Sequence, residues 1–410
     1  MQRNHIKFLF LNLGHFLDHF FVLIFASAAA LQLTSEWGMS YAELIPYATP
    51  GFVAFGLFAI PAGWLADKWS REGMMAIFFV GIGASSAFSS LADTPFEIGL
   101  GLTLVGTFAA IYHPVGLAMV IQGRDKIGMP LAINGIFGNM GVASAALLTG
   151  LLIDTSGWRS AFLIPGIAAM IIGILFLVFE YGGRRIQVVQ DQVIVNESKP
   201  LAVPRKMLIR IFAVIFFTAA VGGIIFQSTT FSLPKVLDER LADLAGSATL
   251  VGLYTFLVFS IAAFAQLVVG YLVDNYPLRT VFAWVALLQI VFFALMIQLT
   301  GMSALIVAIA FMLVVFGEIP INDVLVGRLV GSAWRSRAYA ATYIIGFTVS
   351  ALTLPLIAWI HGSWGFAVLF ALLSGLALLI FIAVLFLPRA HLSIDQSTQV
   401  ASLGSDSSRI

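Results

Sequence analysis

Twelve apolar stretches, each long enough to cross a lipid bilayer, dominate this sequence of 410 residues. A helix needs about 20 mostly apolar residues to span the hydrocarbon core. Only 10% of the residues are charged and the mean hydropathy is +1.01, values that exclude a soluble globular fold. We therefore expect an all-α membrane protein whose twelve transmembrane helices lie near residues 8–33, 44–66, 73–92, 96–121, 131–153, 158–180, 207–233, 247–272, 279–299, 303–327, 338–360 and 364–387.

The distribution of positive charge predicts the orientation of these helices. Lys and Arg are retained on the cytoplasmic side of a membrane. With the N-terminus placed inside, all but Arg159, Lys235 and Arg240 of the 21 Lys and Arg residues fall in cytoplasmic segments. The first apolar stretch is too long for a cleaved signal sequence, so we expect it to remain as a helix. Both termini are predicted to be cytoplasmic.

An internal repeat divides the chain into two halves. Gly63-Trp-Leu-Ala-Asp67 returns 207 residues later as Gly270-Tyr-Leu-Val-Asp274. Further residues recur within one residue of the same shift, namely Pro114 with Pro320, Trp158 with Trp364, Ala161 with Ala367 and Leu163 with Leu369. Parallel six-helix repeats are typical of secondary transporters. The predicted parts are an N-terminal half (1–180), a cytoplasmic linker (181–206), a C-terminal half (207–388) and a disordered cytoplasmic tail (389–410).

The segment that follows the second apolar stretch carries a family resemblance. Residues 63–72, Gly-Trp-Leu-Ala-Asp-Lys-Trp-Ser-Arg-Glu, resemble the loop signature Gly-x-Leu-Ala-Asp-Arg-x-Gly-Arg-Lys of the major facilitator superfamily. Ser70 replaces the usual glycine, and Pro277 interrupts the second copy. The resemblance implies the two-half fold of that superfamily, which usually acts as a monomer. It also implies a conformational latch formed by Gly63, Asp67, Lys68 and Arg71, with Asp274 and Arg279 in the second copy.

A narrower resemblance covers most of the first half. The segments Leu13-Gly-His-Phe-Leu-Asp18, Tyr112-His-Pro114 and Asn134-Gly-Ile-Phe-Gly-Asn-Met-Gly141 are similar to motifs of the fosmidomycin-resistance branch. Val115 stands where that branch has an acidic residue. This resemblance favours proton-coupled export of a drug or metabolite from a bacterial cell across its inner membrane.

Ionisable residues at bilayer depth are functional candidates, because each costs at least about 2.5–3.5 kcal/mol to insert. His15, Asp18 and His19 share one helix face, where a carboxylate next to imidazoles can exchange protons. The alternative is a neutral, hydrogen-bonded packing trio. His113 precedes a helix-breaking proline and is expected to face a cavity, with Tyr112 beside it, or else to bond a freed backbone carbonyl.

The matching region of the second half holds further candidates. Glu318 and Asn322 share a face around Pro320, and we expect Glu318 to line the cavity. Asp323 points away and is expected to pair with Arg328 or with the arginines of the following loop. Substrate or proton-coupling residues are therefore predicted to be His15, Asp18, His19, Tyr112, His113, Glu318 and Asn322.

Small residues recur every third position in the fifth apolar stretch. Gly135, Gly138 and Gly141, with Asn139 between them, would let helices approach closely. The segment partly resembles the antiport motif of drug exporters, but its Gly-Pro pair is missing. We expect these residues to serve helix packing.

The remaining features exclude other classes of protein. A net charge of +1 without a basic block gives no basis for nucleic-acid binding, and the chain has no cysteine and no His-Glu-x-x-His or Gly-x-Ser-x-Gly motif. We predict no enzyme activity, no cofactor other than a proton gradient and no resident metal, although the first-helix histidines could also ligate a cation. The expected partners are the bilayer and a small polar or anionic solute. Uptake of an organic anion or metal complex remains the alternative to export, and a transporter-like receptor or intramembrane enzyme is a remote one.

Overall fold

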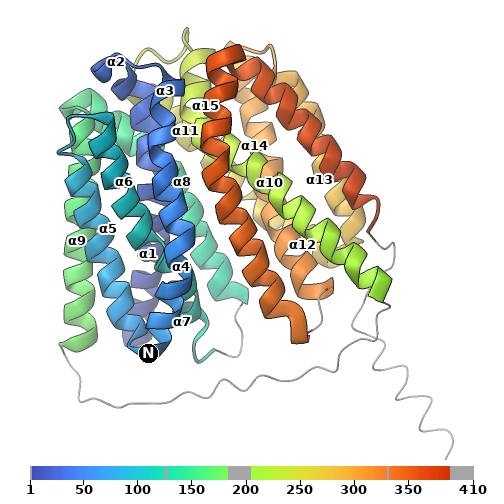
Figure 1. The fold of residues 1–410 in the computed structure, drawn as a ribbon, viewed down its shortest axis with the longest axis horizontal. Helices are drawn as coiled ribbons and strands as arrows, with labels where there is room; N and C mark the ends of the chain where they lie inside the picture. The colour runs from blue at the N-terminus through green and yellow to red at the C-terminus, as the bar shows by residue number, and fades with distance from the viewer. Residues whose placement is uncertain (1, 125–127, 183–204, 330–331, 388–410) are drawn as a thin grey trace, which may run out of the picture.

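The computed structural model describes residues 2–124, 128–182, 205–329 and 332–387, in which every regular element is helical. The predicted linker and tail lie outside these residues, apart from the few positions at their edges. We use "N-terminal half" for helices α1 to α9 and "C-terminal half" for α10 to α15 (Figure 1).

Six long helical segments build the N-terminal half. Three of them are joined to shorter turns, where the chain changes direction or the helix changes its pitch. The elements are α1 (Gln2–Ala28), η1 (Ala29–Leu33), α2 (Thr34–Trp37), α3 (Tyr41–Leu44), η2 (Ile45–Ala48), α4 (Thr49–Lys68), α5 (Arg71–Ser89), α6 (Pro95–Ala109), η3 (Tyr112–Gly116), α7 (Leu117–Ile121), α8 (Gly128–Ser156) and α9 (Trp158–Tyr181).

The C-terminal half contains longer continuous helices. They are α10 (Arg205–Arg240), α11 (Ala248–Ala263), α12 (Ala265–Asn275), α13 (Leu278–Met296), α14 (Gly301–Leu329) and α15 (Ser332–Val384). Within the described residues, eleven helical stretches are long and apolar enough to cross a membrane. The last runs from Thr348 to Val384 and bends at Gly365, whose φ of +73° requires glycine, so it provides two crossings. The described residues therefore contain the twelve predicted crossings.

Packing follows the two halves. In the N-terminal half α1 lies against α8, α5 against α9, and α4 against α6. In the C-terminal half α10 and α13 lie against α15, and α14 packs on α11, α12 and α13. The halves meet where α8 crosses α11 and where α15 contacts α3 and α4. Figure 1 shows the two groups side by side, with the N-terminus at one end of the bundle.

The end opposite the N-terminus, here called the far end, holds close contacts between the halves. Asp154 at the end of α8 accepts hydrogen bonds from the Thr249 backbone N–H (2.7 Å) and hydroxyl (2.5 Å) at the start of α11. Just below, a Cβ on Gly150 or Gly252 would collide with the backbone of the facing helix, so glycine permits this crossing. The Tyr41 ring also packs on His361.

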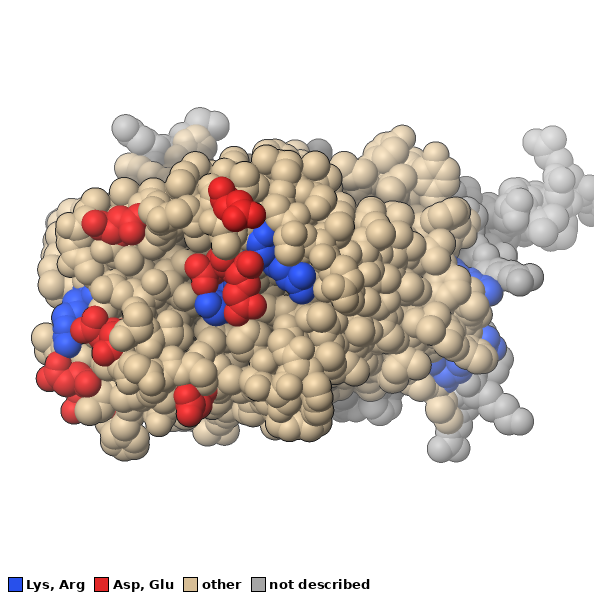
Figure 2. Space-filling view, turned by 90° about the horizontal axis from the view of Figure 1, so that it is seen from above, with Lys and Arg blue, Asp and Glu red and all other residues tan. Residues whose placement is uncertain are grey.

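The two ends of the bundle differ in the charged side chains they carry. At the N-terminal end, Lys7 lies 3.0 Å from Glu72 and 3.5 Å from the buried Glu180, which also pairs with Arg3. The far face shows more acidic than basic side chains (Figure 2). Its acidic residues are Glu36, Glu43, Asp93, Glu97, Asp154, Asp238, Glu239 and Asp243, and its basic residues are Arg159, Lys235 and Arg240.

Candidate functional site

Two helical segments of the N-terminal half bring the candidate histidines together. Helix α1 places His15, Asp18 and His19 on one face, one turn apart. The other segment is interrupted, because Pro114 has no N–H to donate and its ring disturbs the regular helix, so residues Tyr112–Gly116 form the π-helical turn η3. This turn carries His113 to the α1 face.

His15 is fixed in position from several directions. Its Nδ1 lies 2.8 Å from the backbone carbonyl oxygen of Asn134 on α8, so Nδ1 carries the proton and donates it. The Tyr112 ring stacks on the imidazole, with centroids 4.9 Å apart and an angle of 18° between planes. Gly138 lies beneath the ring, where a Cβ would be 2.7 Å from Nε2. This tautomer leaves Nε2 unprotonated, so that Nε2 can accept a hydrogen bond or bind a metal ion.

A buried amide and phenol network supports this arrangement. The Tyr112 hydroxyl donates to the Leu11 carbonyl oxygen at 2.8 Å, and the Asn134 amide donates to Asn12 Oδ1 at 2.9 Å. Both asparagines are buried. Sequence reasoning did not assign Asn12 or Asn134 to the site; their amide groups in otherwise apolar helices were the available signal.

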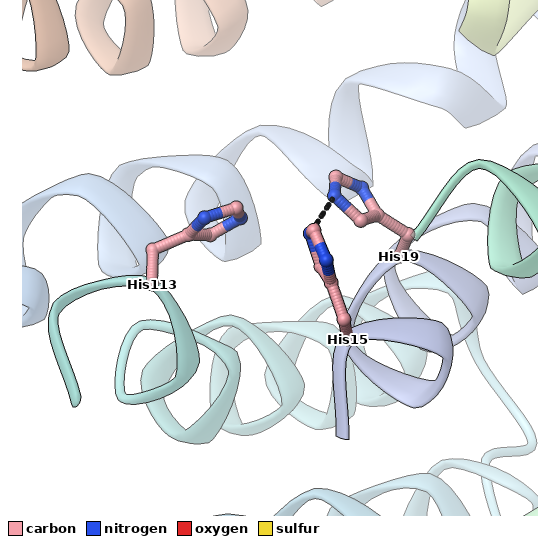
Figure 3. Close-up of side chains that lie close together, drawn as sticks. All are labelled: His15, His19 and His113. Atoms are coloured by element: carbon pink, nitrogen blue, oxygen red, sulfur yellow. Dashed lines mark hydrogen bonds between the residues drawn. The ribbon is translucent and has the colours of Figure 1, made fainter. Parts of the chain in front are cut away.

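The three imidazoles converge on one point (Figure 3). His15 Nε2 and His19 Nε2 are 3.2 Å apart. His113 meets both rings edge-on, with centroids 5.5 Å away in each case. The ligand-type nitrogens of all three residues lie within 4.8 Å of one another. We call His15, His19 and His113 the histidine cluster.

Asp18 lies against this cluster, next to His113. Its carboxylate is fully buried, and Oδ2 is 3.3 Å from His113 Nε2. The contact is close enough for an ion pair, and neither carboxylate oxygen has a hydrogen bond of regular geometry among the described residues. His19 and His113 are half-buried, which leaves the cluster reachable.

Glu318 forms a separate polar site in the C-terminal half. It is buried on α14, and its Oε2 accepts a hydrogen bond of 2.8 Å from the Gln289 amide on α13. Asn322, one turn further along α14, also interacts with the carboxylate. Gly222 on α10 faces Oε1, which has no hydrogen bond among the described residues. Sequence reasoning missed Gln289, whose pairing depends on how α13 packs on α14.

The proposed latch residues lie at the N-terminal end. Asp67 and Arg71 form an exposed ion pair of 2.9 Å, Lys68 is exposed, and Gly63 lies against the ring of Pro114. Ser70, which departs from the family signature, accepts a hydrogen bond from the Gly73 N–H and caps α5.

The second copy of the latch is arranged differently. Arg279 donates to the Leu387 carbonyl oxygen at 3.2 Å, and Asp274 is exposed. The contact of Arg279 with the Leu387 carbonyl therefore differs from the ion pair that Arg71 makes in the first copy.

The glycines of α8 differ in their surroundings. Gly141 faces the Phe16 backbone and Gly138 faces His15, so both lie in the contact with α1, whereas Gly135 has no atom within 4 Å of a built Cβ. Asn139 is half-buried nearby. The predicted pairing of Asp323 with Arg328 concerns side chains outside the described part of the structure.

Comparison with known proteins places this arrangement in context. Residues 11–242 match the profile of the Major Facilitator Superfamily. The chain is 24% identical over 267 residues to the 4-hydroxybenzoate transporter PcaK of Pseudomonas putida, which covers 55% of this chain and 58% of that protein. It is 28% identical over 140 residues to the tetracenomycin C resistance and export protein of Streptomyces glaucescens, covering 32% of this chain and 26% of the relative.

A solved structure agrees along nearly the whole chain. The crystal structure of a D-xylose–proton symporter superimposes with a TM-score of 0.70 at 15% identity, covering 93% of this chain and 97% of the other. The twelve-helix fold is therefore shared with transporters. The narrower resemblance to the fosmidomycin-resistance branch stays a prediction.

Proposed function

Because this chain belongs to the major facilitator superfamily, we propose that it moves a small organic anion across a bacterial inner membrane by alternating access, coupled to protons. Members of the family are transporters and not enzymes, so an intramembrane enzyme is set aside. The proposal treats the chain as a monomer whose two halves rock against each other around a central site.

The burial of the Glu318 carboxyl group within a membrane-spanning helix is the observation that supports proton coupling most directly. A carboxylate at membrane depth is costly, and binding a proton removes its charge. Its surroundings are an amide from Gln289, the amide of Asn322 and the backbone of Gly222, with no cation among the described groups that contact it. Proton binding at Glu318 would therefore change the electrostatics between α10, α13 and α14.

The N-terminal half supports an anionic and partly aromatic solute. The half-buried His19 and His113 provide N–H groups for an anion, and the Phe55 ring lies 6.0 Å from the His113 ring. A small cavity further toward the far end, of about 20 Å³, is lined by Phe25, Phe52 and Phe55 among other apolar residues and would have to widen to admit an aromatic solute. The 4-hydroxybenzoate relative makes aromatic carboxylates the first solutes to test.

The charge distribution and the relatives support one sidedness and one direction of transport. The basic residues of the N-terminal end support a cytoplasmic location for both termini. Export is favoured by the resemblance noted above and by the relative described as an export protein. Release on the other side would then require the Asp154–Thr249 contact at the far end to part.

The decisive experiment measures solute-induced pH change in proteoliposomes. We expect one class among aromatic carboxylates, phosphonates and small inorganic anions to move protons in wild-type protein. Glu318→Gln should lower the proton flux by at least tenfold and keep solute counterflow, because the variant mimics a permanently protonated side chain. Glu97→Gln, an exposed capping residue on the far face, is the matched control.

Each other outcome has a defined meaning. Undiminished proton flux in Glu318→Gln would remove the assigned proton site. Absence of any solute-dependent flux, with solute binding retained, would favour the receptor alternative. Everted and right-side-out vesicles, compared with the same solute, would decide between export and uptake.

A further inference from the structure

We propose that the histidine cluster is a binding site for a divalent transition-metal ion of the Zn²⁺ type. Nothing in the family membership or the relatives' names assigns a metal to this chain. The inference concerns residues that the proposed function also assigns to the solute, but metal binding is an equilibrium property measured without any solute, so either proposal can fail while the other holds.

The spacing of the nitrogens matches a coordination sphere. Imidazole nitrogens bound to one tetrahedral zinc at 2.0–2.1 Å stand about 3.3 Å apart. His15 Nε2 and His19 Nε2 are already 3.2 Å apart, and the third imidazole lies within 4.8 Å. A rotation of the His113 side chain would close the remaining distance.

The surroundings of His15 are those of a metal ligand. A ligating histidine usually donates its other N–H to a carbonyl or carboxylate, which fixes the tautomer and the ring direction. Here Nδ1 donates to the Asn134 carbonyl oxygen, and Tyr112 stacks on the ring. The unprotonated Nε2 therefore faces His19, whose Nε2 is 3.2 Å away (Figure 3).

The local charge suits a cation. Imidazoles bind a metal ion in their neutral form, and the buried Asp18 side chain, 3.3 Å from His113, would contribute −1 when ionised beside the metal. A divalent ion would offset this buried charge and leave a net +1. With three protein ligands, a fourth position stays open for water or for a carboxylate.

The donor set selects the metal class. Imidazole nitrogen favours Zn²⁺, Co²⁺, Ni²⁺ and Cu²⁺, whereas Mg²⁺ and Ca²⁺ prefer oxygen ligands. The chain has no cysteine, so no thiolate competes elsewhere. The competing explanation is a plain hydrogen bond between His15 and His19, which would show no metal affinity.

Titration of the full-length protein in nanodiscs with Co²⁺ tests the site, using a purification tag without histidine. We expect one saturable site with the visible absorption of tetrahedral Co²⁺, displaced by Zn²⁺ and not by Mg²⁺. Affinity should fall by on the order of 100-fold or more in His19→Gln and His113→Gln, and by about 10–100-fold in Asp18→Asn. His5→Gln and His361→Gln, which lie outside the cluster, should bind like wild type.

Two results would overturn the proposal. One is wild-type protein without saturable binding; the other is binding that survives in His113→Gln or disappears in His5→Gln. If the His19 and His113 variants fail to fold, X-ray absorption spectroscopy of the Zn²⁺-loaded wild-type protein would show instead whether imidazole nitrogens bind the metal. Three imidazole nitrogens at about 2.0–2.1 Å support the site, and an oxygen-only shell refutes it.

Discussion

The histidine cluster and the Glu318 site lie beside the equivalent prolines of the two halves but are built differently. At Pro114 the helix divides into α6, η3 and α7, and a histidine reaches across to α1. At Pro320 the helix α14 continues, and the carboxylate of Glu318, two residues earlier, meets an amide from α13. The duplicated framework has kept the position of the proline while the chemistry around it has diverged.

The two sites also differ in how tightly their polar groups are held. His15 is fixed by a backbone carbonyl, a stacked phenol ring and the surface of Gly138. Glu318 is held by the Gln289 amide and by Asn322, and its Oε1 has no hydrogen bond among the described residues. The comparison indicates a rigid ligand site in the N-terminal half and a movable carboxylate in the C-terminal half.

The largest expected stability effect tests the rigidity of the N-terminal site. Gly138→Ala would place a Cβ 2.7 Å from His15 Nε2, and the clamped ring cannot retreat. We expect the free energy of unfolding to fall by about 1–3 kcal/mol. Gly135→Ala on the same helix meets no atom within 4 Å and should keep or raise stability by up to about 1 kcal/mol. Equal unfolding curves in nanodiscs for the two variants would contradict the rigid site.

A smaller effect is expected where the two halves meet. Asp154→Ala removes both hydrogen bonds to Thr249 and should weaken the far-end contact by about 1 kcal/mol, roughly a fivefold shift toward opening. The natural absence of cysteine permits a single reporter at the buried Ala48, whose labelling by a thiol reagent should become faster.

The matched control for this contact is Asp93→Ala. Asp93 pairs with Arg159 inside the N-terminal half, at 2.8 Å, so its loss should leave labelling of the reporter unchanged. Faster labelling in both variants would mean that the N-terminal half itself loosens, and the two halves would no longer be independent units.

The smallest stability effect is expected at the C-terminal site. Gly222→Ala brings a Cβ 2.5 Å from Glu318 Oε1, but this is the end of a flexible side chain that can turn away. A rotamer cost of about 0.5–1.5 kcal/mol is offset by the helix preference of alanine, about 1 kcal/mol, so unfolding should shift by less than about 0.5 kcal/mol.

A transport assay should distinguish Gly222→Ala from a glycine substitution that affects neither stability nor the Glu318 site. Proton-coupled turnover should fall in Gly222→Ala because the carboxylate is displaced, while Gly270→Ala, with no atom near its Cβ, should behave like wild type. A large loss of stability in Gly222→Ala would show that Glu318 is held as firmly as His15.

Much of the fold could be read from apolar length alone. Hydrocarbon thickness sets the length of a crossing, so the run lengths gave the twelve helices, and the repeat indicated two related halves. The helix spacing of His15, Asp18 and His19 likewise placed them on one face before any contact was known. The expectation that Gly138 and Gly141 lie in a helix contact fits their positions, whereas Gly135 has open space.

What the sequence could not decide is which distant residues meet. His113 was expected to face a cavity, but its approach to the α1 histidines depends on how η3 packs beside α1, and the Gln289 partner of Glu318 depends on the packing of α13 on α14. Local spacing fixes neighbours within one helix, because helical geometry is the same everywhere. Contacts between helices depend on the side chains of both partners. Only the tertiary structure therefore showed that the three imidazoles lie together and that the Gln289 amide donates to the Glu318 carboxylate.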